Sequence, residues 1–188
     1  MIFYEETVES KSLFKGNVTE YVVEKVKLPN GQFAQREIVR HDAASAVIAF
    51  TENDEIVLVK QYRKAIESES VEIPAGLLDE EDESGLEAAK RELEEETGYQ
   101  AEHWSPVTSF YSTPGFTDEY LEIYEAHGLK KVENPLAQDD DENLELIIAT
   151  YDEAWELYEK GLLRDSKSVF ALFYWKMKRL MKKNKDES

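Results

Sequence analysis

The most informative part of the sequence is residues 91–99, which read Arg91-Glu92-Leu93-Glu94-Glu95-Glu96-Thr97-Gly98-Tyr99. On an α-helix, Glu92, Glu95 and Glu96 are spaced i, i+3 and i+4, so their carboxylates gather on one flank. Like charges at this spacing repel one another, and the cluster mildly destabilises a helix that has no partner for it. Oxygen ligands packed in this way suit Mg²⁺ or Mn²⁺, which bind a few carboxylates and keep positions for water and phosphate.

The residues before this stretch extend the helical pattern back to about residue 83. Leu86, Ala89 and Leu93 recur at i, i+3 and i+7, and this apolar stripe would face the core. Gly98 follows where a helix C-terminal cap belongs. The sequence therefore predicts a helix over residues 83–97 with one apolar side and one acidic side.

Outside this helix, the pattern predicts mainly strands. Residues 19–28 and 33–41 are rich in alternating and β-branched positions, and Pro29-Asn30-Gly31 between them predicts a hairpin. Further strands are expected at residues 45–50, 55–62, 102–110, 120–126 and 144–151, and further helices at 152–160 and 167–181. A short segment at residues 70–73 leads into Pro74-Ala75-Gly76. The last helix carries Val169, Phe173, Met177 and Leu180 on one side.

The composition excludes several classes of protein. The 188 residues include 41 acidic and 22 basic side chains, a net charge of −19, which disfavours nonspecific binding to nucleic acid or to anionic lipid. No apolar run approaches the roughly 20 residues of a membrane helix, and the acidic N-terminus lacks a signal-peptide pattern. The absence of cysteine excludes disulfides and thiol chemistry, and it agrees with the cytoplasmic location that we expect.

The negative charge is concentrated in two segments. Residues 79–102 hold eleven acidic and two basic side chains, a net of −9, and residues 133–159 hold ten acidic and no basic ones, a net of −10. Together they give −19, so the rest of the chain sums to zero. Residues 139–143 alternate like a calcium-binding loop, but Leu144 and Thr150 stand where that loop needs glycine and glutamate.

The acidic helix resembles the signature of the Nudix hydrolase family. The chain has Glu83, seven residues, then Arg91-Glu92-Leu93-x-Glu95-Glu96-x-Gly98, as that signature requires. It departs from the signature in two places, because six residues rather than five separate Gly76 from Glu83, and Tyr99 replaces an aliphatic residue. The alternative interpretation is a surface helix with dense acidic decoration and an accidental match.

Other motifs resemble the ADP-ribose pyrophosphatases within that family. They are Arg36-Glu37-Ile38-Val39, Gln61-Tyr62-Arg63, Val71-Glu72-Ile73-Pro74-Ala75-Gly76 and the loop Thr113-Pro114-Gly115-Phe116-Thr117-Asp118-Glu119, in which Pro114 lies sixteen residues after Gly98. The resemblance implies an α/β protein: a Nudix α/β/α sandwich with a mixed sheet over residues 43–188. It also implies an N-terminal antiparallel β arm over residues 1–42 that serves dimerisation.

The resemblance further implies metal-dependent hydrolysis of ADP-ribose, or of a related nucleoside diphosphate-X, with ADP-ribose giving AMP and ribose 5-phosphate. Mg²⁺ is the expected metal, Mn²⁺ a substitute, and the expected assembly a homodimer. The implied metal ligands are the Ala75 carbonyl, Glu92, Glu96 and Glu142; the catalytic set is Asp140 as general base, Glu95 and Arg91; and the substrate-binding set is Arg36, Arg63, Phe116 and Glu119. Arg91 would fix the carboxylates rather than meet substrate, and Arg36 would act on the partner subunit's substrate.

Several alternatives stay open at this point. The enzyme could prefer a nucleotide sugar, NADH or a dinucleoside polyphosphate. The chain could instead be a non-catalytic module that senses a nucleotide, or an acidic protein that buffers metal. Arg63 and Arg36 could be solvated strand charges, and residues 139–142 a solvated acidic loop.

Overall fold

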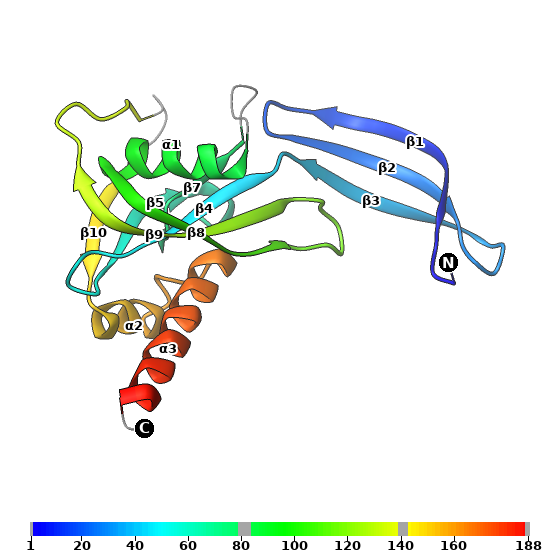
Figure 1. Cartoon of the computed structure of the whole chain (residues 1–188). Coiled ribbons are helices and arrows are strands. Elements are labelled where there is room, and N and C mark those ends of the chain that lie inside the picture. Colours follow the sequence, from blue (N-terminus) through cyan, green and yellow to red (C-terminus); the bar gives the residue numbers. More distant parts are fainter. Residues whose placement is uncertain (1, 79–83, 139–142, 187–188) are drawn as a thin grey trace. The chain divides into compact units, whose positions relative to one another are not determined.

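The computed structural model describes residues 2–78, 84–138 and 143–186, and they form two compact units (Figure 1). The first unit contains the chain up to Ala44 together with Ser109–Leu121. Its sheet has the order β1-β2-β3, built from β1 (Glu6–Lys15), β2 (Thr19–Lys27) and β3 (Phe33–His41), and neighbouring strands are antiparallel. β2 and β3 pair from Thr19↔His41 to Lys27↔Phe33, which confirms the predicted hairpin.

The second unit contains Ser45–Thr108 and Glu122–Ser188. One sheet has the order β10-β5-β6 and another the order β7-β4-β9-β8. The strands are β4 (Ala44–Ala49), β5 (Ile56–Arg63), β6 (Ser68–Glu72), β7 (Ala75–Leu77), β8 (Tyr99–Tyr111), β9 (Tyr120–Lys131) and β10 (Glu145–Ala149), and a 3-10 turn, η1 (Lys64–Ile66), joins β5 to β6. The helices are α1 (Gly85–Thr97), α2 (Tyr151–Glu159) and α3 (Ser166–Asp186).

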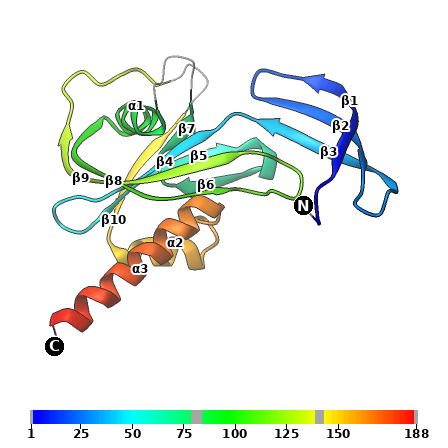
Figure 2. The ribbon, with the colours of Figure 1, turned by 45° about the vertical axis from the view of Figure 1, so that its right-hand side comes forward.

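Helices cover both faces of these sheets. Helix α1 lies on one face, and α2 and α3 lie on the other (Figures 1 and 2). On the α1 side, Ala89 and Leu93 pack with Val47, Val57 and Ala126 in a fully buried cluster. This is the predicted α/β/α arrangement, joined to an N-terminal antiparallel sheet.

Three features differ from the sequence-based expectation. The N-terminal sheet has a third strand, β1, whose ten residues are all exposed, so no burial pattern marks it in the sequence. Strand β7 is only three residues long and follows Pro74, so it is too short for a periodic signal. On α3, Phe173, Met177 and Leu180 are exposed, because the buried side is formed by residues such as Leu172 and Trp175.

No helix among residues 2–78, 84–138 and 143–186 is long and apolar enough to cross a membrane.

Candidate active site

Helix α1 has well-defined ends. Ser84 precedes the helix in an extended conformation, and its hydroxyl accepts a hydrogen bond from the Glu87 amide. At the other end Gly98 has a φ of 70°, in the left-handed region that glycine adopts at low cost, and its amide donates to the Glu94 carbonyl over 2.8 Å. The helix runs from Gly85 to Thr97, and Glu83 of the predicted range lies outside the described residues.

Glu92 and Glu96 are one helical turn apart and both are buried, with exposed fractions of 8% and 3%. The Ala75 amide donates a hydrogen bond to Glu96 Oε2 over 3.1 Å. A Cβ atom placed on Gly76 would lie 2.0 Å from Glu92 Oε1. Any side chain at position 76 would therefore displace the Glu92 carboxylate from the place that it occupies here. The two carboxylates and the strand β7 thus form one compact group.

Arg91 joins this group from the same helix. Its Nη1 donates to Glu92 Oε1 over 2.6 Å and to Glu95 Oε2 over 2.9 Å, and its Nη2 donates to the Leu77 carbonyl over 2.9 Å. The guanidinium therefore holds two carboxylates of α1 against β7 and offsets part of their mutual repulsion. The resemblance implies that Arg91 fixes the carboxylates rather than meeting substrate, and this role stays a prediction.

A second charged group lies beside the first. Arg63, at the end of β5, donates to both Glu72 oxygens, from Nε over 2.9 Å and from Nη2 over 2.7 Å. Lys167, near the start of α3, contacts the same carboxylate and also Asp165. Arg63 is therefore one half of a bidentate ion pair, with its side chain still 44% exposed, and its role in binding substrate stays a prediction.

The charges in this second group change one another's pKa. Burial by itself would raise the pKa of Glu72, but the hydrogen bond from Arg63 and the charge of Lys167 outweigh burial and bring it to about 2. Burial would likewise lower the pKa of Lys167, and the charges of Asp165 and Glu72 reverse this, so its pKa is raised. Glu72, Lys167 and Arg63 are therefore all ionised near neutral pH.

The other proposed substrate-binding residues belong to the first unit. Arg36 pairs with Glu5 through two hydrogen bonds, from Nε over 2.8 Å and from Nη2 over 2.6 Å. Phe116 is exposed, and its carbonyl accepts a hydrogen bond from the Val39 amide. Glu119 lies 4.0 Å from His41 Nδ1. Within this unit the loop that bears Phe116 and Glu119 is thus fastened to β3.

Glu92 and Glu96 offer hard oxygen donors that fit a divalent cation, because both carboxylates are buried and next to one another. The part of the chain that the structure describes holds no cluster of three or more His, Cys, Asp or Glu side chains arranged around a metal position. Asp140 and Glu142, the expected base and the expected further ligand, lie outside that part. Their roles, like the ligand role of the Ala75 carbonyl, stay predictions.

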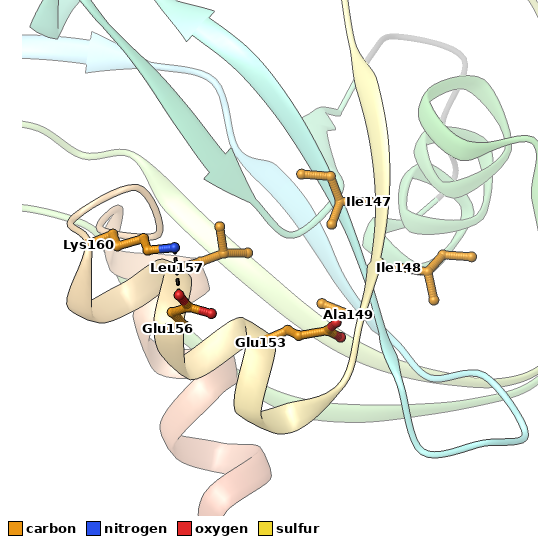
Figure 3. Close-up of a pocket in the computed structure, with 7 residues that line it drawn as sticks. All are labelled: Ile147, Ile148, Ala149, Glu153, Glu156, Leu157 and Lys160. Carbon is orange, nitrogen blue, oxygen red and sulfur yellow. Dashed lines mark ion pairs between the residues drawn. The ribbon is translucent and has the colours of Figure 1, made fainter.

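A pocket of about 220 Å³ lies elsewhere in the second unit, between β10 and α2 (Figure 3). Ile147, Ile148, Ala149 and Leu157 line it, with Glu153, Glu156 and Lys160. None of the residues expected to bind metal or substrate is among them. This pocket is therefore distinct from the α1 carboxylates.

The sequence reasoning missed Glu72 and Lys167 as members of the site. A signal existed for Glu72, because a charged residue between Val71 and Ile73 in a buried strand needs a partner. No such signal marks Lys167, since it lies 95 residues further along the chain and looks like any helical lysine.

Comparison with known proteins agrees with this geometry. The model of the NUDIX domain matches residues 39–172. The methanol dehydrogenase activator of Bacillus methanolicus is 46% identical over 96% of this chain and 97% of its own length. The ADP-ribose pyrophosphatase of Bacillus subtilis (strain 168) is 40% identical over the same shares.

Comparison with solved structures gives the same fold. A crystal structure of an ADP compounds hydrolase superposes with a TM-score of 0.84 over 97% of both chains, at 21% sequence identity. The resemblance drawn from residues 83–98 and from the flanking motifs is thus confirmed. The family match over residues 39–172 and the near-full-length relatives establish that this chain belongs to the Nudix family.

Proposed function

We propose that the protein hydrolyses the pyrophosphate bond of ADP-ribose and releases AMP and ribose 5-phosphate. The observation that carries this proposal is the 40% identity, over 96% of this chain, to an ADP-ribose pyrophosphatase. The paired buried carboxylates of α1 support it, because they provide the anionic ligand set that diphosphate chemistry needs. The bond between one phosphorus and the bridging oxygen breaks, a water oxygen bonds to that phosphorus, and the proton of the water goes to a carboxylate base.

Nudix hydrolases generally depend on a divalent metal ion, and Mg²⁺ is the ion proposed here, with Mn²⁺ as a substitute. Glu92 and Glu96 would hold it, with the Ala75 carbonyl and Glu142. When bound, the ion neutralises phosphoryl charge and lowers the pKa of a coordinated water. The residues of the chain supply position: Arg91 fixes Glu92 and Glu95, and the Ala75 amide fixes Glu96.

A panel of substrates tests this proposal. Purified protein with Mg²⁺ is incubated with ADP-ribose, a nucleotide sugar, NADH and a dinucleoside polyphosphate, and the products are separated by chromatography. We expect the highest kcat/KM with ADP-ribose and equal amounts of AMP and ribose 5-phosphate. Faster cleavage of another member of the panel would transfer the substrate assignment to that compound.

A second candidate function is activation of a dehydrogenase. It is favoured by the 46% identity to the methanol dehydrogenase activator over nearly the whole of both chains. The test compares the rate of a methanol dehydrogenase with and without this protein. The variant Glu96→Gln then separates activation by binding from activation by hydrolysis. Activation that survives this substitution would identify a binding role, whereas activation lost together with turnover would make hydrolysis its cause.

We also propose a homodimer formed through the N-terminal sheet. All ten residues of β1 are exposed, and they include the apolar side chains of Val8, Leu13 and Phe14. A solvent-exposed edge strand with apolar side chains is a surface that proteins usually cover. Arg36 acting in trans and a cytoplasmic location remain predictions that accompany this proposal.

A further inference from the structure

The Glu72 carboxylate holds two cations inside the second unit. Its exposed fraction is 2%, and that of Lys167 is 9%. A charge removed from water at such a position is costly unless it is paired and hydrogen-bonded. Glu72 meets this requirement with the bidentate bond from Arg63 on one side and with Lys167 on the other. The three charges therefore form a fixed unit in which each side chain limits the movement of the others.

Arg63 differs from its two partners because it reaches the surface. Its side chain is 44% exposed, although its Nε and Nη2 are held by Glu72. No described residue accepts a hydrogen bond from its remaining nitrogen, Nη1. A guanidinium fastened along one edge and open along the other is arranged to receive a planar or tetrahedral anion.

The same segment of chain connects this group to the α1 carboxylates. The Ile73 amide, next to Glu72, donates to Ser168 Oγ on α3 over 2.8 Å, and two residues later the Ala75 amide donates to Glu96. The segment 72–75 is thus fixed by α3 at one end and by α1 at the other. The pKa of Arg63 is raised first by its hydrogen bond to Glu72 and, with a smaller contribution, by the charge of Glu96.

We propose that Glu72, itself held by Lys167, is a positioning residue that directs the open edge of Arg63 toward a phosphate of the diphosphate substrate. The inference rests on the proposed function for the identity of the anion. Without Glu72 the Arg63 side chain would sample many rotamers, and each substrate molecule would have to order it on binding. The role of Glu72 is therefore indirect, and its effect on the reaction passes through Arg63.

A set of four variants tests this role: Glu72→Gln, Arg63→Gln, the double variant of the two, and Glu69→Gln as control. Glu69 lies on the same strand but is exposed and pairs with Lys60, so its substitution makes the same chemical change outside the group. We expect Glu72→Gln to raise the KM for ADP-ribose on the order of tenfold with a smaller change in kcat. We expect the double variant to match Arg63→Gln alone, because Glu72 acts through Arg63.

One result would overturn the proposal. If Glu72→Gln raises the KM by the same factor in the unsubstituted protein and in Arg63→Gln, Glu72 acts on the fold and the proposal is wrong. Lys167→Met is the second variant, in case Glu72→Gln does not fold. It should raise the KM in the same way, and Lys167→Arg should restore most of the loss. Thermal unfolding midpoints of all variants confirm that the assays measure folded protein.

A measurement that needs no turnover separates this inference from the proposed function. The Nε–H group of Arg63 gives a resonance in ¹⁵N–¹H spectra, assigned by its loss in Arg63→Lys. It should exchange slowly with water in the unsubstituted protein and in Glu69→Gln, and quickly in Glu72→Gln and Lys167→Met. If this holds while ADP-ribose is not cleaved, only the proposed function has failed. Equal exchange in all variants would overturn the positioning role, whatever the substrate.

Discussion

Two glutamates and one glycine define the centre of the candidate site at the scale of single residues. Glu92 and Glu96 are buried side by side on α1, and the Glu92 carboxylate lies against Gly76. Two buried carboxylates repel each other, and Arg91 donates to Glu92 while the Ala75 amide donates to Glu96. A divalent cation bound between these oxygens would reduce the repulsion further, so the proposed metal would stabilise the site as well as serve the chemistry.

The close approach at Gly76 leads to the first prediction. In Gly76→Ala the new Cβ would lie 2.0 Å from Glu92 Oε1, so the Glu92 carboxylate must move. We expect kcat to fall between about tenfold and a hundredfold, and the Mg²⁺ concentration for half-maximal rate to rise, as for a misplaced ligand. Initial rates measured over a range of Mg²⁺ concentration check this. Unchanged rates at every concentration would mean that Glu92 need not occupy this position.

The elements around the site meet through charged side chains that are distant in sequence. Glu72 at the end of β6 and Lys167 at the start of α3 are 95 residues apart, yet they are in contact and nearly buried. Lys167 and Ser168 therefore bind the first turn of α3 to the segment that carries Ala75 and Gly76. This contact explains how the last helix of the chain can influence a site built mainly from α1 and β7.

The charge of Glu72 makes this contact sensitive to acid, which is the second prediction. The pKa of Glu72 is about 2 in the folded protein and 4.5 in the unfolded chain, so the folded state binds the proton more weakly. The stabilisation is complete above pH 4.5 and is lost as the pH falls toward 2, and it amounts to about 3 kcal/mol. Urea unfolding at several pH values measures it.

Two variants on β6, Glu72→Gln and Glu69→Gln, show how much of this pH dependence comes from Glu72. The free energy of unfolding should fall less steeply below pH 4.5 in Glu72→Gln than in the unsubstituted protein, and Glu69→Gln should keep the original slope. Parallel curves for all three proteins would show that Glu72 carries no such stabilisation.

At this scale the sequence predicted local elements well and contacts between elements poorly. The helix expected over residues 83–97 is α1 (Gly85–Thr97), because its apolar spacing and Gly98 are local signals. The group of Glu72, Arg63 and Lys167 was not predicted, because it depends on which surfaces meet after folding. The exposed Phe173 and Met177 show the same limit: an apolar stripe on α3 indicated one face, while packing buried another.

The whole molecule combines a family fold with an uneven distribution of charge. The net charge of −19 is located in residues 79–102 and 133–159, and the first of these includes the helix α1. Of that helix, Glu92 and Glu96 are buried, whereas Glu87 is exposed. The acidity of the chain is therefore partly a set of buried groups in the candidate site and partly solvated surface.

Self-association is the third prediction and belongs to this scale. Light scattering coupled to size-exclusion chromatography should give twice the 21.7 kDa of one chain. Phe14→Glu places a charge among the exposed apolar side chains of β1 and should shift the protein toward monomer. Met181→Glu, at another exposed apolar position, on α3, should not. A measured mass of 21.7 kDa at every protein concentration would show that the protein is a monomer and that the dimer proposal is wrong.

The central claim is that the buried carboxylates of α1 hold the metal ion needed to hydrolyse a diphosphate, and Glu96→Gln tests it most directly. Glutamine keeps the shape of Glu96 and can still accept the Ala75 hydrogen bond, so the fold should be retained while the charge is lost. Initial rates with ADP-ribose and Mg²⁺ are compared with those of Glu87→Gln, the same change at an exposed position of the helix. We predict that kcat falls at least about a hundredfold in Glu96→Gln and stays within about twofold in Glu87→Gln. Full turnover by Glu96→Gln would contradict the account.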